Sequence, residues 1–395
     1  MTVVVRPVRT ADEMAAFRGL VVESLFGSPP APGWHEGFAK KTGAENVFVA
    51  HSRSEVVGGY VLFPFGQFFG GRSVPMGGVS AVAVAPHARG KGAAIAMMRH
   101  ALREARRRGQ PLAALYPATQ TLYRKAGFEL AGSRIHYRVP TRLIGIGDRS
   151  LEVRRVGADE RAAVQHVYRQ RAQATNGNLD RIDWSWGRVF EDAVLPVWGH
   201  LILERRRPVG YVVQHHKPPA GGARFYDVHV RDVAALTPGA ARRIWALLGD
   251  TRSIAENVLV YGSPADPFLQ HLPEQDYRVD TRWDWMLRIV DVRAALEARG
   301  YATGVTAKVE LDVVDDVVRS NHGRFVFEVG GGEARLRRGG AGRVKIDVRG
   351  LASLYSGYLS PADLVVTGQI SGPEPDLAAL APAFAGPAPW MPDMF

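Results

Sequence analysis

The segment that most constrains the fold is a strand-like run followed by a basic, glycine-rich turn and a helix. Residues 78–85 read GVSAVAVA, and their small and β-branched side chains are typical of a strand buried on both faces. Pro86 ends this strand, the turn HARGKGAA follows, and residues 93–108 are good helix formers that stop at Gly109 and Pro111. The order of the elements predicted for the first segment, β-α-β-β-β-α-β-α-β, indicates a mixed α/β fold.

The start of this helix has the properties of an anion-binding site. A helix N-terminus presents unpaired backbone N–H groups and about half a positive charge, and glycines let a ligand approach the backbone closely. Neither GxxxxGK[ST] nor GxGxxG is present, and a solvated basic turn is an equally good interpretation of the glycines alone. Further arginines continue along the helix, namely Arg99, Arg103 and Arg106 to Arg108. The residues predicted to hold phosphates are Arg89, Gly90, Lys91, Gly92, Ala93 and Ala94.

The charge of the chain is concentrated in its first third. The 395 residues carry a formal charge of +11. Residues 1–140 hold 18 Lys and Arg against 8 Asp and Glu, a net +10, whereas residues 141–395 hold 32 against 31, a net +1. A basic domain suits nucleic acid, an acidic membrane surface or a polyphosphate cofactor. No recognisable nucleic-acid motif accompanies the basic helix, although its charge alone permits a nucleic-acid binder.

Composition excludes several classes of protein. A hydrophobic content of 46% supports several buried cores and excludes full-length disorder. No run approaches the roughly 20 apolar residues that span a bilayer, and the N-terminus lacks the apolar segment of a signal peptide. We therefore expect a soluble, cytoplasmic protein without a membrane partner. Cysteine is absent and the 12 histidines include no HExxH-like pair, so a site without metal is expected.

The pattern of elements indicates three domains. Strands over 47–51 and 56–65 form a predicted hairpin whose sequence VVGGYVLF is similar to VGYVVQHH near the middle of the chain, although chance similarity is an alternative. This second cycle has no Arg-Gly-x-Gly before its helix. From about Met286 a short helix, several strands and a proline-rich tail predict an α+β domain. The predicted domains are 1–140, 148–287 and 288–395.

Two motifs give the chain a family resemblance. Arg-x-x-Gly-x-Ala after a Val-x-Val-x-Pro strand resembles the acyl-CoA-binding motif of the GNAT acetyltransferase superfamily, and residues 122–129, LYRKAGFE, resemble its later helix-and-strand segment. Over nearly the whole chain the sequence is similar to the Eis (enhanced intracellular survival) family of multi-acetylating aminoglycoside acetyltransferases. The resemblance implies tandem GNAT domains with mixed sheets flanked by helices, then a sterol-carrier-like α+β domain. It also implies acetyl-CoA as co-substrate, a small-molecule amine acceptor and a hexamer.

The same resemblance implies roles for particular residues. Tyr123 matches the family's general acid, and the terminal carboxylate of Phe395 matches its general base. Backbone amides of Val82, Ala83 and Val84 would pair with the pantetheine arm, and an N–H near Val82 could polarise the thioester carbonyl. Without the family, Tyr123 reads as a packed aromatic residue, and Tyr116, Tyr137 and Tyr60 as core or sheet residues.

The acceptor is the least constrained part of the prediction. A polycationic aminoglycoside needs an acidic pocket, yet the first domain carries +10. The predicted acceptor-binding residues are Glu23, Trp34, Glu36 and Asp393. The alternatives are an acetyltransferase of other small amines or of protein lysines with no aminoglycoside activity, or a non-catalytic acyl-CoA or lipid-binding module.

Overall fold

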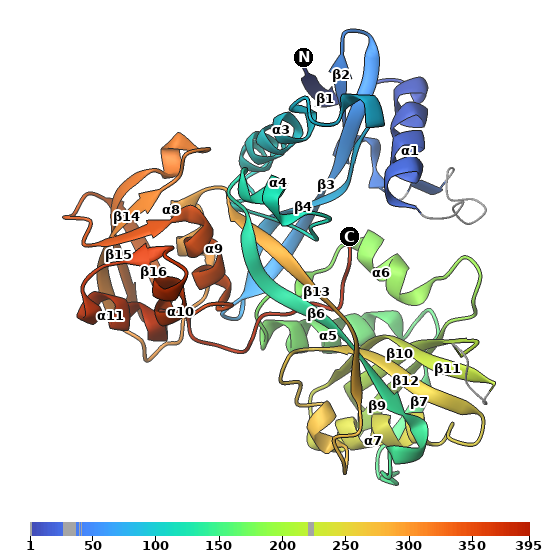
Figure 1. Cartoon of the computed structure of the whole chain (residues 1–395). Helices are drawn as coiled ribbons and strands as arrows, with labels where there is room; N and C mark the ends of the chain where they lie inside the picture. Colours follow the sequence, from blue (N-terminus) through green and yellow to red (C-terminus); the bar gives the residue numbers. More distant parts are fainter. Residues whose placement is uncertain (1, 27–36, 39, 41, 220–224) are drawn as a thin grey trace. The chain divides into compact units, whose positions relative to one another are not determined.

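The computed structural model describes residues 2–395 except 27–36, 39, 41 and 220–224. It forms two compact units (Figure 1). The first comprises residues 1–132, 284–387 and 394–395, and the second comprises 133–283 and 388–393. In the described part of the chain, no helix is long and apolar enough to cross a membrane.

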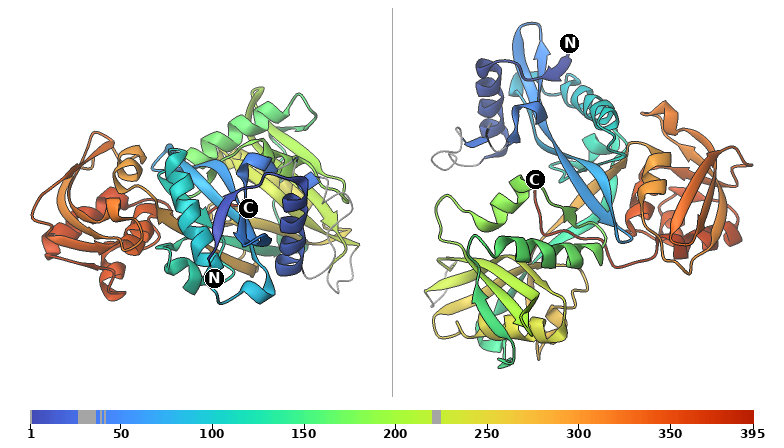
Figure 2. Two further views of the ribbon diagram at one scale, coloured as in Figure 1. Left: turned by 90° about the horizontal axis from the view of Figure 1, so that it is seen from above. Right: turned by 180° about the vertical axis from the view of Figure 1, so that it is seen from behind.

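The first unit contains the predicted hairpin, formed by β2 and β3. β3 is longer than the sequence indicated. β3 and β4 pair antiparallel along most of their length, and β1 pairs with β2. β4 begins six residues before the predicted strand, because residues 72–77 pair with the end of β3. Helices α1 and α3 cover opposite faces of these strands (Figures 1 and 2). The bounds are β1 Val4–Pro7, α1 Ala11–Leu25, β2 Val47–Ser52, β3 Glu55–Phe69 and β4 Arg72–Val84.

The core of this part lies between α3 and the sheet. α3 buries Met97, Met98 and Leu102 against strand residues such as Phe48 and Leu115. β5 is parallel to β4 and antiparallel to residues 286–289 of β13, a strand that the sequence analysis did not predict. The bounds are α3 Ala93–Arg107, β5 Leu112–Leu115, α4 Gln120–Arg124, β6 Glu129–Pro140 and β13 Arg278–Ile289.

The second unit repeats this arrangement. Its strands follow the order β6-β12-β11-β10-β9-β7, with β11 and β12 parallel, as β4 and β5 are. Tyr60 of β3 and Tyr211 of β10, the tyrosines of the two similar hairpins, are both fully buried. The bounds are β7 Glu152–Arg155, α5 Arg161–Gln173, β8 Leu179–Asp180, α6 Asp183–Phe190, β9 Trp198–Glu204, β10 Arg207–Lys217, β11 Tyr226–Ala235, α7 Pro238–Gly249 and β12 Ala255–Gly262.

Residues 292–384, in the first unit, form a five-stranded sheet with helices. The strand order is β16-β15-β14-β17-β18. Alternating buried positions along β14 and β15 give this sheet one apolar face, on which α9 and α11 pack. The bounds are α8 Val292–Ala298, β14 Ala307–Val314, β15 Gly323–Gly330, β16 Glu333–Arg338, β17 Val344–Asp347, α9 Val348–Ser356, α10 Pro361–Val366, β18 Ile370–Ser371 and α11 Glu374–Phe384.

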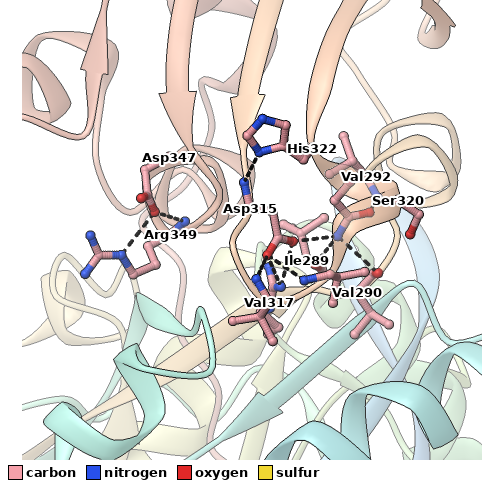
Figure 3. Close-up of polar contacts among 12 residues, drawn as sticks. Ile289, Val290, Val292, Asp315, Val317, Ser320, His322, Asp347 and Arg349 are labelled. Atoms are coloured by element: carbon pink, nitrogen blue, oxygen red, sulfur yellow. Dashed lines mark hydrogen bonds and ion pairs between the residues drawn. The ribbon is translucent and has the colours of Figure 1, made fainter.

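A buried ion pair joins this sheet to the end of β13. Nη2 of Arg288 lies 2.7 Å from Oδ2 of Asp315, and neither side chain is exposed. Asp315 also accepts hydrogen bonds from the backbone N–H of Val317 and from Nδ2 of Asn321 (Figure 3). Asn321 in turn donates to the carbonyl oxygens of Ile289 and Val290 at 3.2 Å. The carboxylate is therefore well satisfied, as a buried charge requires.

Candidate active site

A β-bulge interrupts β4 where the sequence predicts contacts to the pantetheine arm. Gly59 pairs with Ala83 and Val61 pairs with Ser80, so the single residue between them on β3 faces two residues of β4. One of these two, Ala81, has φ +49°, a left-handed conformation that a residue with a side chain rarely adopts. A bulge leaves its extra residue outside the ladder, which makes backbone groups next to Val82 available to a ligand.

The edge of β4 facing β5 is open beyond this point. β4 pairs with β5 only at Met76–Gly78, and β4 continues for six residues, to Val84. In the described part of the chain no other strand pairs with that edge. An extended ligand arm could add to it by strand-like hydrogen bonding.

The predicted phosphate loop is exposed and lacks a cap. Gly92 is the N-cap residue of α3, and no side chain caps the helix, so its first amides keep their hydrogen-bonding capacity. Gly90 and Gly92 have φ of +72° and +88°, and a Cβ at either position would meet nothing within 4 Å. The glycines are therefore needed for their backbone conformation, and open space surrounds them. Such a loop fits a pyrophosphate group.

The structure corrects the predicted charge distribution along α3. Arg107 and Arg108 pair with Glu104, and Arg106 pairs with Asp291 at 2.9 Å. These three arginines are therefore neutralised by carboxylates and do not extend the phosphate-binding surface. In the described loop and helix, the exposed cations Arg89, Lys91, Arg99 and Arg103 have no carboxylate at ion-pair distance. The unpaired positive charge thus lies in the loop and along the helix as far as Arg103.

Tyr123 lies in α4 and packs in the same hydrophobic cluster as the bulged strand. The cluster includes Phe128, whose ring is 6.2 Å from that of Tyr123, and its partly buried members include Val82 and Val84. The tyrosine side chain is 5% exposed. Burial raises the pKa of Tyr123 to about 12, so the hydroxyl stays protonated at neutral pH.

Phe395 lies where the pairing of β4 with β5 ends. Its ring is 5.1 Å from that of Phe65 and 6.0 Å from that of Tyr116, measured between centroids. A Cβ added at Gly78 would lie 3.2 Å from Cδ2 of Phe395 and only 2.5 Å from Phe65. A side chain at position 78 would therefore clash with Phe65 and press closely on Phe395. Tyr116, which the sequence suggested to be an ordinary core residue, is one of its contacts.

Of the four predicted acceptor-binding residues, Glu23 and Asp393 lie among the described residues. Glu23 is exposed on α1, while Trp34 and Glu36 lie outside the described residues. Asp393 is occupied by an ion pair, because its Oδ1 is 2.9 Å from Nε of Arg181. Burial raises the pKa of Asp393, although the positive charge of Arg181 opposes this shift. Sequence reasoning did not find Arg181, since nothing in the local pattern around it marks a partner 212 residues away.

No group of three or more histidine, aspartate or glutamate side chains in the described ranges could hold a metal ion. The groups gathered near the bulge are the phenol of Tyr123, backbone amides of β4 and the N–H groups at the start of α3. Donors of this kind can hold an acyl thioester.

Comparison with known proteins agrees with this arrangement. Two descriptions of an acetyltransferase (GNAT) domain match residues 5–131 and 177–289, and a sterol carrier protein domain matches residues 292–392. An uncharacterized N-acetyltransferase of Streptomyces griseus is 31% identical over 82% of this chain and 83% of its own. N-acetyltransferase Eis of Mycobacterium tuberculosis is 29% identical over 85% of each chain. A GCN5-related N-acetyltransferase from Anabaena variabilis, of known crystal structure, is 35% identical over the full length of both chains, with a TM-score of 0.95.

The bulged strand, the glycine-rich loop and the helix that it opens define an acetyltransferase of the GNAT class. Two such domains followed by a sterol-carrier-like domain confirm the predicted fold class. The chain belongs to the Eis family of GNAT N-acetyltransferases. Enzymes of this class use acetyl-CoA.

Proposed function

We propose that the protein transfers the acetyl group of acetyl-CoA to a primary amine by direct attack, with Tyr123 as general acid and the carboxylate of Phe395 as general base. The observation that carries this proposal is the position of Phe395 at Gly78, beside the open edge of β4. The Phe395 ring contacts those of Phe65 and Tyr116, which hold the residue at this position.

The acetyl donor would be held by backbone groups and loop charges. The loop from Arg89 to Ala94 would hold the pyrophosphate with amides and with the side chains of Arg89 and Lys91. Amides of Val82 to Val84 would pair with the pantetheine arm. An N–H next to the bulge would stabilise the negative charge that develops on the thioester oxygen.

The reaction needs one base and one acid. The amine nitrogen forms a bond to the carbonyl carbon, the Phe395 carboxylate takes the proton that the nitrogen loses, and the carbon–sulfur bond breaks. Tyr123 donates to the departing thiolate. Burial raises the pKa of Tyr123 to about 12, so its hydroxyl donates the proton only after negative charge has developed on the sulfur. The α-carboxylate has an ordinary pKa of about 3.5, so a relay water would carry the proton from an ammonium group.

We propose a broad class of acceptor and a narrower class within it. A small primary amine is the broader proposal, and an aminoglycoside acetylated at several positions is the narrower one. Asp393 is paired with Arg181, so one of the predicted acidic residues is not available to bind the acceptor. This argues against a strongly cationic acceptor. A less charged amine or a lysine side chain therefore belongs in the same experiment. The hexamer stays a prediction from the resemblance, and the cytoplasmic location also stays a prediction.

The test is an acceptor screen that detects released CoA thiol, covering aminoglycosides, polyamines, arylalkylamines and lysine peptides. Product stoichiometry reports multi-site acetylation. For the base, a Phe395→Leu variant keeps the carboxylate in register, whereas one added C-terminal glycine moves it outward by a residue. We expect the extension to lower kcat at least tenfold more than Phe395→Leu, with acetyl-CoA binding retained in both. Equal kcat for the two variants would remove the carboxylate from the mechanism.

A further inference from the structure

The second unit holds a cavity beside the strand edge that corresponds to the edge proposed to bind acetyl-CoA in the first domain. The cavity measures about 230 Å³ and is lined by the end of β11, the start of α7 and Tyr261 of β12. β11 and β12 pair in parallel only up to His229, and β11 then continues to Ala235. The described residues thus leave open the same strand edge that β4 leaves open beside β5.

The bulge is also repeated. Val213 pairs with Asp232 and the next residue, Gln214, pairs with Val230, so Arg231 of β11 is an extra residue. In each unit the bulge therefore lies on the strand that precedes the helix. The second unit thus has a bulge and an open strand edge at the corresponding places, although the bulged Arg231 does not share the left-handed φ of Ala81 and the sequence lacks the glycine-rich loop.

The start of α7 cannot serve a pyrophosphate as the start of α3 can. Only Leu236 and Thr237 separate β11 from α7, whereas residues 85–92 separate β4 from α3. The Thr237 side chain already accepts from the N–H of Ala240, and Pro238 at the first helical position has no N–H to offer. A CoA ligand is therefore disfavoured, and the cavity requires a smaller occupant.

Two hydrogen-bond donors on the cavity wall have no partner among the described residues. Trp390 is 5% exposed and its Nε1 is buried without a hydrogen bond. Arg171 of α5 has its guanidinium carbon 5.5 Å from the centre of the Trp390 ring, and no described carboxylate lies at ion-pair distance from it. A buried N–H without a partner costs free energy that a ligand acceptor would recover. The pair therefore favours a negatively charged acceptor group.

Most of the remaining wall is apolar, and its one described carboxylate is hydrogen-bonded. Both oxygens of Asp266 accept hydrogen bonds, from the backbone N–H of Ser263 and of Phe268, at 2.8 and 2.9 Å. Burial lowers the pKa of His271, which keeps its ring neutral at pH 7. The other lining side chains are mostly apolar, including Val233, Leu236 and Phe268. Such a wall suits a short hydrocarbon chain.

We propose that this cavity binds a small amphipathic monocarboxylate, with the carboxylate at Arg171 and Trp390 Nε1 and the hydrocarbon chain along Val233, Leu236 and Phe268. The site is separate from the proposed acetyl-transfer chemistry, and its test does not depend on catalysis.

The experiment is calorimetric titration of the full chain with octanoate, and with octylamine as the oppositely charged analogue. We expect one saturable octanoate site and no octylamine binding. Arg171→Gln should weaken octanoate binding roughly tenfold or more, since a charged hydrogen bond is lost. Trp390→Phe keeps the ring but removes the N–H, and should weaken binding by about three- to tenfold. The matched control is Arg169→Gln, an exposed arginine of the same helix, which should leave the affinity unchanged.

A competition experiment with CoA tests whether octanoate binds in this cavity and not in the proposed acetyl-CoA site. Saturating CoA should leave the octanoate affinity unchanged. Displacement of octanoate by CoA, binding that survives both variants, or no saturable binding of carboxylates from four to ten carbons would each overturn the proposal. Should Arg171→Gln lower the Tm, the milder Trp390→Phe variant decides the outcome.

Discussion

Arg181 and Asp393 form a buried ion pair in the second unit, with 2.9 Å between Nε and Oδ1. Arg181 is 1% exposed and also contacts Asp232, which accepts a hydrogen bond from the hydroxyl of Tyr211 at 2.7 Å. One guanidinium thus serves two carboxylates in the core of a domain. Asp393 belongs to the segment 388–393 of the second unit, so the pair anchors this segment to the core of that unit.

Replacing Arg181 by methionine should destabilise the second unit strongly. The substitution leaves Asp232 and Asp393 buried without their cation, and breaking a buried pair in this way costs about 3–5 kcal/mol. Denaturant unfolding followed by the fluorescence of the second unit's tryptophans measures the change. Arg169→Gln serves as control, because the exposed contact between Arg169 and Asp180 is long, at 3.7 Å, and should contribute less than about 0.5 kcal/mol. Similar losses for the two variants would refute a structural role for the buried pair.

Two glycines with nearly the same backbone conformation should respond differently to alanine. Gly127 has φ +84° and a Cβ there would lie 2.8 Å from Cζ of the buried Arg288, whereas Gly109 has φ +70° and open space around it. Gly109→Ala should lower the free energy of unfolding by about 1 kcal/mol, because only the left-handed backbone conformation is unfavourable for alanine there. Gly127→Ala should cost about 1–3 kcal/mol more, because it also displaces Arg288 from Asp315. Thermal unfolding of both variants compares them directly, and equal Tm values would contradict this account.

The start of α3 should govern acetyl-CoA affinity through charge. Replacing both Arg89 and Lys91 by glutamine should raise the KM for acetyl-CoA about tenfold or more, with little change in Tm, since both side chains are exposed. Arg107→Gln is the control on the same helix, because that arginine is already paired with Glu104. The difference between the two variants should shrink as salt is raised. A KM that does not change in the double variant would argue against a phosphate contact.

The second unit should lose stability in mild acid. Burial is the main cause that lowers the pKa of His136, His215 and His229 to about 4, from an ordinary value near 6.5. The unfolded chain therefore binds protons more readily than the folded unit, so stability is complete above pH 6.5 and falls as the pH drops toward 4. His229→Asn should flatten this decline. Thermal unfolding between pH 7.5 and 4.5 measures it, and a decline that the variant shares in full would assign it to other groups.

Much of the first domain could be predicted from local sequence. The hairpin, the strand ending at Pro86 and the helix ending near Gly109 follow from glycine, proline and apolar spacing, which act over a few residues. The strand β13 was not predicted, because its pairing with β5 joins segments far apart in the chain. The ion pair between Arg106 and Asp291 was not predicted, for the same reason.

By itself, the sequence determined the family and the order of the domains, since these depend on residue types at short spacing. Only the tertiary structure decided that Phe395 lies at Gly78, that Asp393 is held by Arg181, and that the second unit has a cavity beside the end of β11. These relationships depend on packing and on charges brought together from distant segments. No local pattern encodes a partner that the chain meets only after it has folded.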